Sequence, residues 1–248
     1  MDLDPGTIAI IQLAWSRRLG LEDDALSAAG DEERIYDVHD EANEVKFVRL
    51  FGREVFSGPE WAAEQVRSKS TAELSSFSGL LRLSLDHGGR GMAEEHLYYT
   101  DSYPPIPGAE ELAVADDYHY AEALERLCPP DDVVEAKLSG REILFVLVDD
   151  TGPGAPVPVA GAGYSIREGI LADVGTLTAP DHRMRGLGSY ITSVAVEDAM
   201  AAGLIPQSRI QSNNLGASRT AAQAGFVSAG LCTSVSLPAL PRRLPVDP

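Results

Sequence analysis

Two arginines and two glycines within six residues form a pattern suited to binding an anion. Arg183, Arg185, Gly186 and Gly188 follow a stretch of alternating β-branched residues that Pro180 ends, and an amphipathic helical pattern begins near Gly186. The first amides of a helix have no partner within the helix and carry the positive end of its dipole. Glycine lets a ligand approach the main chain closely, and arginine pairs with phosphate. The stretch therefore predicts a site for a phosphate-containing ligand.

Three common loop motifs do not account for this stretch. A Walker loop requires a lysine after its last glycine, but lysine occurs only at positions 46, 69 and 137. The segment Gly161-Ala-Gly163 has Ile166 where a dinucleotide-binding fingerprint has its third glycine. A nucleophile elbow around Ser165 is excluded because Arg167 stands in place of the closing glycine.

The surrounding sequence predicts the elements that hold the stretch in place. Residues 173–178 read as a strand, and residues 186–202 read as a helix. The remaining second half predicts helices at 116–127, 131–138 and 217–224 and strands at 141–149, 159–166, 209–212 and 226–237. The first half predicts a helix at 7–21, strands at 44–56 interrupted at Gly52, and a helix that begins with a capping box at Ser70 and runs to about Leu85.

Three blocks of the second half resemble the GNAT superfamily of N-acetyltransferases. The pattern Arg183-x-x-Gly186-x-Gly188 is similar to the family's pyrophosphate loop, and Ala172–Pro180 is similar to the strand that precedes it. Downstream, Asn214-Leu-Gly-Ala-Ser218 leads to Ala224-Gly225-Phe226, as in the end of the family domain. The blocks stand in family order and at family spacing, and the resemblance covers roughly residues 113 to 238.

The resemblance implies acetyl-CoA as the cofactor and assigns residues to its parts. The pantetheine arm would pair with the backbone of a strand that splays from its neighbour, and Asn214 and Ser218 would lie near that arm unless they act as helix caps. The alternative for Arg183 and Arg185 is a surface salt bridge. The implied residues are Thr176, Leu177 and Thr178 for the pantetheine arm and Arg183, Met184, Arg185, Gly186, Leu187, Gly188 and Ser189 for the pyrophosphate.

The same resemblance identifies Asp173 as the candidate base. Acetyl transfer to nitrogen needs a neutral amine, so a base must take up a proton. A carboxylate in a partly apolar cleft is expected to have a raised pKa, although a salt bridge with Arg167 is an alternative for Asp173. Many family members carry a tyrosine as general acid where this chain has Ala221. Tyr164, Tyr190 or a water would have to replace it, and Tyr190 is our candidate.

Composition limits the partners of the protein. The formal net charge of -18 disfavours nucleic acid and anionic membranes and permits an amine-bearing acceptor. The two cysteines, Cys128 and Cys232, have no spacing typical of a metal site or a disulfide framework, so no metal is expected. No apolar run reaches the roughly 18 residues of a membrane span, and a cytoplasmic location is the expectation. A homodimer is left open.

We therefore expect an α/β (α+β) protein with the GNAT acyl-CoA N-acyltransferase fold and a mixed, mostly antiparallel sheet. The expected organisation is an N-terminal α/β region at 1–108, an acetyltransferase domain at 109–240 and a proline-rich tail at 241–248. The N-terminal region would be a degenerate GNAT-like half, or a substrate-recognition or dimerisation module. The predicted activity is acetyl-CoA-dependent transfer to a primary amine of a small molecule or protein. The alternatives are transfer to oxygen and a non-catalytic acyl-CoA-binding module with a regulatory or scaffolding role.

Overall fold

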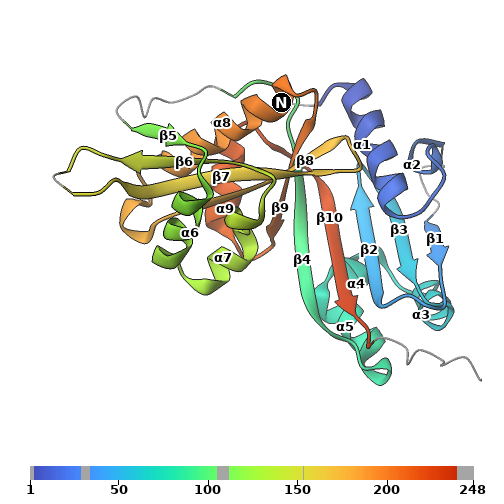
Figure 1. The fold of residues 1–248 in the computed structure, drawn as a ribbon. Coiled ribbons are helices and arrows are strands. Elements are labelled where there is room, and N and C mark those ends of the chain that lie inside the picture. Colours follow the sequence, from blue (N-terminus) through green and yellow to red (C-terminus); the bar gives the residue numbers. More distant parts are fainter. Residues whose placement is uncertain (1–2, 29–33, 105–111, 153, 239–248) are drawn as a thin grey trace, which may run out of the picture.

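One ten-stranded mixed sheet runs through the whole protein (Figure 1). The structure is a computed structural model, and it describes residues 3–28, 34–104, 112–152 and 154–238. The strand order is β1-β3-β2-β10-β4-β9-β8-β7-β6-β5. The pairs β1/β3 and β8/β9 are parallel and the other pairs are antiparallel, so the expected mixed, mostly antiparallel sheet is confirmed. The expected tail at 241–248 lies outside the described residues.

The strands are short near the two edges of the sheet and longest near its middle. Their bounds are β1 Ile35–Val38, β2 Glu44–Leu50, β3 Arg53–Gly58, β4 Arg90–Tyr99, β5 Ala113–Ala115, β6 Ile143–Asp149, β7 Val157–Arg167, β8 Leu171–Thr178, β9 Ile205–Gln211 and β10 Val227–Ser236. The α-helices are α1 Pro5–Arg18, α2 Ala25–Ala28, α3 Glu60–Val66, α4 Thr71–Ser75, α5 Phe77–Ser84, α6 Tyr118–Leu127, α7 Pro130–Ala136, α8 Leu187–Ala201 and α9 Leu215–Gln223.

Local sequence signals explain several of these elements. Phe51 and Gly52 both adopt positive φ in the turn between β2 and β3, which is where the sequence predicts an interruption. Ser70 and Glu73 form the predicted capping box at the start of α4. The predicted continuous helix to about residue 85 is instead two helices, because Ser76 is extended and caps α5 through Gly79.

Helices cover both faces of the β5–β9 part of the sheet (Figure 1). Helices α8 and α9 pack on one face around Tyr164, Val174 and Phe226. Helices α6 and α7 pack on the other face around Leu144, Val146 and Leu177. Strand β8 therefore lies between two helical layers, with Val174, Thr176 and Thr178 toward α8 and the alternating residues toward α7.

Strands from the two halves of the chain interleave in the sheet. Strand β4, from the first half, lies between β9 and β10 and pairs with both. Strand β10, from the second half, lies between β4 and β2. The boundary expected near residue 108 falls outside the described residues, and the strands on its two sides share one hydrogen-bonded sheet.

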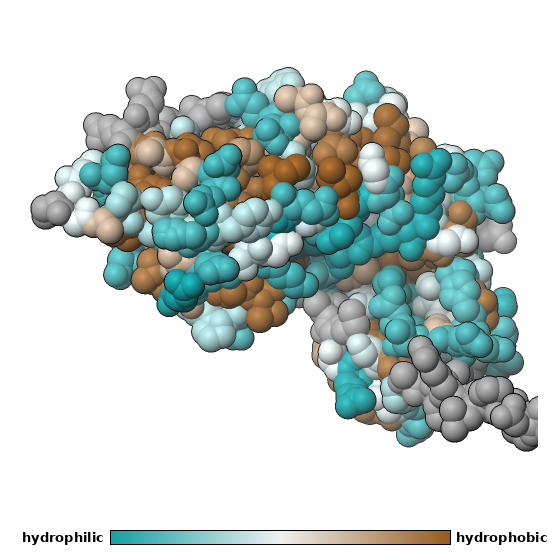
Figure 2. All heavy atoms as spheres, viewed as in Figure 1, coloured by the Kyte–Doolittle hydropathy of each residue, from teal (hydrophilic) through white to brown (hydrophobic). Residues whose placement is uncertain are grey.

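The N-terminal helix packs against the sheet near the point where β8 begins. Trp15 of α1 is 1% exposed and lies in a hydrophobic cluster with Leu97, Leu171 and Cys232. On the face seen in Figure 2, hydrophilic residues predominate over the β1–β3 end. No helix among the described residues has the length and apolar character needed to span a bilayer.

Candidate active site

A cavity opens where β8 separates from β9. Their parallel pairing runs from Leu171↔Ile205 only to Val174↔Ser208, although β8 continues to Thr178 and β9 to Gln211. The space between the diverging strands belongs to a cavity of about 570 Å³ that is lined by β8, β9 and the ends of α7, α8 and α9. The splayed strand that the resemblance implies is therefore present at residues 175–178.

Backbone groups of β8 face this gap without a neighbouring strand. The amide of Ala179 donates to the carbonyl of Val159, at the β7 side. Because N–H and C=O groups alternate along a strand, those of Thr176 and Thr178 face the opposite side, toward the gap. Consistently, the carbonyl of Thr178 accepts a hydrogen bond from Arg183 Nε at 3.2 Å.

The loop before α8 leaves the first amides of that helix uncapped. Gly186 is the N-cap residue at φ 79°, and it provides no side chain to accept a hydrogen bond from Leu187, Gly188 or Ser189. All three of these residues line the cavity. A Cβ atom on Gly188 would lie 2.9 Å from Thr178 Oγ1, so glycine is what allows α8 to approach β8 this closely.

Arg183 crosses the mouth of the cavity toward α7. Its Nη2 atom lies 2.6 Å from Asp132 Oδ2, and the two side chains are 44% and 35% exposed. The salt bridge considered as an alternative for Arg183 is therefore present. Met184 lines the cavity and is 96% exposed, whereas Arg185 contacts His182 Nδ1 at 3.2 Å and is not among the lining residues.

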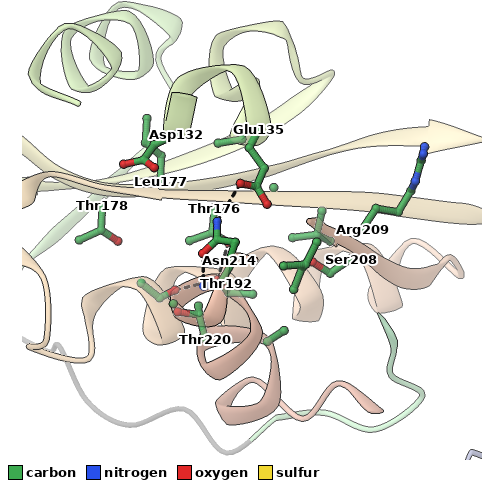
Figure 3. Close-up of a pocket in the computed structure, with 18 of the residues that line it drawn as sticks. Asp132, Glu135, Thr176, Leu177, Thr178, Thr192, Ser208, Arg209, Asn214 and Thr220 are labelled. Atoms are coloured by element: carbon green, nitrogen blue, oxygen red, sulfur yellow. Dashed lines mark hydrogen bonds between the residues drawn. The ribbon is translucent and has the colours of Figure 1, made fainter. Parts of the chain in front are cut away.

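Asn214 is a helix cap that also bridges two helices (Figure 3). Its Oδ1 accepts from the amide of Ala217 at 3.0 Å, and its Nδ2 donates to Glu135 Oε2 at 2.7 Å. The other oxygen of Glu135 accepts from the amide of Gln211 at 3.2 Å. Ser218 donates to the Asn214 carbonyl and does not line the cavity. Glu135 could not be identified from the sequence, because its hydrogen-bond partners Gln211 and Asn214 are more than 70 residues away.

Asp173 lies in an ion pair, and its pKa is not raised as expected. Its Oδ2 atom lies 3.1 Å from Arg141 Nη1, and its Oδ1 atom accepts from Gln207 Nε2 at 3.2 Å. Burial alone would raise the pKa of Asp173, but the charges of Arg141 and Arg209, with the hydrogen bonds from Gln207 and Arg141, lower it below the ordinary value. The expectation of a raised pKa is thus wrong, and the ion-pair partner is Arg141 rather than Arg167.

Gly175 makes room for that ion pair. A Cβ atom at this position would lie 2.4 Å from both the Ala136 carbonyl oxygen and Arg141 Nη2. The guanidinium of Arg141 therefore passes directly over the backbone of β8, where it also binds the Ala136 carbonyl. Neither Arg141 nor the role of Gly175 was identified from the sequence.

A chain of buried hydrogen bonds ties the N-terminal helix to Asp173. Trp15 Nε1 donates to Tyr99 Oη at 2.6 Å, and Tyr99 donates to Gln207 Oε1 at 2.7 Å. Gln207 then donates to Asp173, as described above. Tyr99 and Gln207 are both 0% exposed, so this chain is shielded from solvent. The orientation of Gln207, and with it one hydrogen bond of Asp173, therefore depends on α1 and β4.

The two ends of the cavity differ in their side chains (Figure 3). Thr178 and Asp132 lie at one end, near the α8 loop, and Arg209 lies at the other. Arg209 forms an ion pair with Glu95 of β4, while its Nε atom is buried and has no hydrogen-bond partner. Arg18 and Arg167 also line the cavity, so the N-terminal helix contributes directly to its wall.

No tyrosine in the described chain lines the cavity. Ala221 does line it, at the position where the resemblance implies a tyrosine. Tyr164 donates to Asp198 at 2.6 Å, and burial together with that carboxylate raises its pKa. Tyr190 packs against the hydrophobic cluster under α8. The hydroxyl groups that do line the cavity belong to Thr176, Thr178, Ser165, Ser189, Thr192, Ser208 and Thr220.

Metal-ligating side chains do not cluster in the described part of the chain. No group of three or more His, Cys, Asp or Glu residues there is arranged to hold an ion. Burial raises the pKa of both Cys128 and Cys232, which keeps these thiols protonated. The polar groups that line the cavity are carboxylates, hydroxyl groups, guanidinium groups, side-chain and backbone amides, the imidazole of His182 and the ammonium group of Lys137.

Comparison with known proteins gives matches only among solved structures. No family model and no curated protein matches the chain. A GCN5-related N-acetyltransferase from Kribbella flavida is similar with a TM-score of 0.47 and 20% identity, over 64% of this chain and 64% of that one. An acetyltransferase from the GNAT family from Colwellia psychrerythraea gives 0.44 and 18%, over 63% and 60%. A tandem GNAT protein from the clavulanic acid biosynthesis pathway gives 0.38 and 14%, over 64% and 58%.

The chain thus spans about three fifths of the length of these solved structures.

Proposed function

We propose that the protein is an acetyl-CoA-dependent N-acetyltransferase of the GNAT type that acts on a primary amine. The observation that carries the proposal is the separation of β8 from β9, which leaves Thr176 and Thr178 without a partner strand on that side, beside the uncapped start of α8. A long ligand with a diphosphate at one end and an amide-containing arm matches both features. Arg183 and residues 186–189 of the motif line the cavity, whereas Arg185 and Ser218 do not.

The cavity residues divide into two binding roles. The amides of Leu187, Gly188 and Ser189, with Arg183, would hold the diphosphate through the helix dipole and direct hydrogen bonds. The backbone of Thr176 and Thr178 would hold the pantetheine arm. Leu177 and Asn214 would contribute less directly, since Leu177 is 3% exposed and Asn214 uses its amide to cap α9 and bind Glu135.

The reaction requires the acceptor nitrogen to attack the acetyl carbonyl carbon. A C–N bond forms, the C–S bond breaks, and the proton lost by the amine ends on the base or solvent while the thiolate leaves. The leaving group is a thiolate, and because thiols such as that of cysteine ionise at about pH 8.5, no strong acid is needed to release it. A backbone amide of β8 at the gap would stabilise the tetrahedral oxyanion.

Asp173 remains our proposed proton acceptor, acting through water. Its lowered pKa makes it a weak base but keeps it ionised, so it also attracts the ammonium form of the acceptor. Tyr190 is the proposed acid only if the helix end moves, since it lies outside the cavity lining. The homodimer and the cytoplasmic location stay predictions.

One observation favours a second candidate, a non-catalytic acyl-CoA-binding module. Ala221 lines the cavity where a tyrosine is implied, and no described tyrosine replaces it there. A binder would retain the diphosphate site without needing an acid or a base.

Release of free thiol from acetyl-CoA in the presence of an amine panel separates the two candidates. An enzyme releases thiol in proportion to acetylated amine detected by mass spectrometry, whereas a binder shows calorimetric binding of coenzyme A without thiol release. Absence of coenzyme A binding at millimolar concentration would refute both. If Asp173→Asn leaves the rate unchanged at every pH, Asp173 is not the base.

A further inference from the structure

The cavity end around the start of β8 carries an excess of positive charge. Two carboxylates line it, Glu95 and Asp173, against four guanidinium groups, those of Arg18, Arg141, Arg167 and Arg209. Arg141 forms an ion pair with Asp173, and Arg209 forms an ion pair with Glu95. Within the described part of the chain, Arg18 and Arg167 form no ion pair. This local excess contrasts with the formal charge of -18 for the whole protein.

Arg18 is held in place without an anionic partner. It is the last residue of α1, and its guanidinium carbon lies 5.1 Å from the centre of the Trp15 ring. Partial burial, followed by the nearby charge of Arg209, lowers the pKa of Arg18. The guanidinium stays charged near neutral pH. A bound anion would offset both the desolvation and the repulsion from Arg209.

The anion for Arg18 is not the diphosphate of the proposed cofactor. Asp173 marks one end of the cavity and Thr178, beside the α8 loop, marks the other. Five residues along a strand correspond to about 17 Å. Arg18 interacts electrostatically with Asp173 and Arg209, which places it at the end remote from Arg183. An anionic group at this end would therefore belong to the acceptor.

We propose that the acceptor is an amine that also carries a carboxylate, and that Arg18 binds that carboxylate. The proposal rests on the acetyltransferase function and names its substrate class. Guanidinium groups pair with carboxylates through parallel hydrogen bonds, while Glu95 and Asp173 in the same end provide negative charge for the ammonium group. A zwitterionic acceptor matches both signs of charge. A phosphate dianion fits less well, because two carboxylates line the same space.

The N-terminal half acquires a role from this proposal. Arg18 comes from α1 and Glu95 from β4, both encoded before residue 108. The half of the chain without a family motif would thus supply the groups that recognise the acceptor, in a cavity whose cofactor end comes from the other half.

Calorimetric titration with pairs of amino acids and their amides tests the proposal. Each pair differs only in the carboxylate, and each is titrated into the full-length protein with and without saturating coenzyme A. Phosphoethanolamine is included as an amine that carries a phosphate. The variants are Arg18→Gln and, as a matched control, Arg17→Gln, whose side chain pairs with Asp23 instead of lining the cavity.

We expect at least one acid to bind about tenfold or more tightly than its amide, since hydrogen bonds to charged groups are among the strongest. Arg18→Gln should abolish this preference and Arg17→Gln should preserve it. Equal binding of acid and amide, a preference that survives Arg18→Gln, tighter binding of phosphoethanolamine, or no binding of any acid would each overturn the proposal. Failure of coenzyme A to bind would refute the acetyltransferase function separately. The titration without coenzyme A would still measure whether the site around Arg18 prefers the acid to its amide.

Discussion

Asp132 competes with the proposed diphosphate for Arg183. The carboxylate holds Arg183 Nη2 at 2.6 Å across the mouth of the cavity, so the arginine must change partners before it can bind a phosphate. Asp132→Asn removes this competition and one negative charge near the helix start. We therefore expect tighter binding of coenzyme A by the variant.

The exposure of the pair sets the size of the effect. Because the side chains of Arg183 and Asp132 are 44% and 35% exposed, solvent screens their attraction, and such pairs contribute about 0.2–1 kcal/mol. If the wild-type protein must break this pair to bind coenzyme A, its removal in Asp132→Asn lowers the dissociation constant by about 1.4-fold to fivefold. The gain should shrink as the ionic strength rises toward 1 M, where the Debye length falls to about 3 Å.

Isothermal titration calorimetry with coenzyme A at low and high salt measures the change. Asp131→Asn is the matched control, because Asp131 is exposed in the same first turn of α7 and forms no ion pair in the described chain. An equal gain in both variants would show that only the overall charge matters. Weaker binding by Asp132→Asn would refute the assignment of Arg183 to the diphosphate.

Three further substitutions test other parts of the site. Gly175→Ala should lower the melting temperature by about 3–10 °C, since its Cβ would lie 2.4 Å from Ala136 O and Arg141 Nη2. The control Gly152→Ala should leave the melting temperature unchanged, because the space around Gly152 is open. Equal melting curves for the two variants would contradict this prediction. Gly188→Val should weaken coenzyme A binding by roughly tenfold or more, because the new side chain would occupy the space of the diphosphate. The valine would also clash with Thr178 Oγ1, so the loss of affinity should persist in the double variant in which Thr178→Ala removes that hydroxyl. Recovery of binding in the double variant would place the ligand elsewhere. The pKa of Asp173 is lower in the folded protein than its ordinary value of 3.8, so ionised Asp173 stabilises the fold above that pH. The difference in unfolding free energy between the protein and Asp173→Asn, measured with urea, should therefore be largest above about pH 4 and shrink as the pH falls through the folded-state pKa. A difference that stays constant with pH would exclude the ion pair as its cause.

Much of the secondary structure could be predicted because its signals are local. Pro180 and the glycines at 186 and 188 mark the junction between β8 and α8, and Ser70 marks a helix start. Most of the residues proposed to hold the cofactor belong to one strand–loop–helix segment, so they adjoin in sequence as well as in space. The extended conformation of Ser76, which divides α4 from α5, had no such signal.

The acceptor end could not be predicted, because its residues come from distant segments. Arg141 and Asp173 are separated by 32 residues, and Arg209 and Glu95 by 114. The expectation of a raised pKa for Asp173 is wrong for this reason, because the sequence shows a carboxylate on a strand but not which cations pack over it. The insertion of β4 between β9 and β10 brings Glu95 to Arg209, and no periodicity in the sequence encodes that pairing.

The sequence by itself determined the strand–turn–helix that is suited to a diphosphate, since alternation, proline and glycine act on neighbouring residues through backbone sterics. The tertiary structure alone decided where β8 leaves β9 and which arginines line the far end of the cavity. These features depend on the packing of α1 and α7 against β8 and on the pairing of β4 with β9, and such long-range contacts are a property of the whole chain.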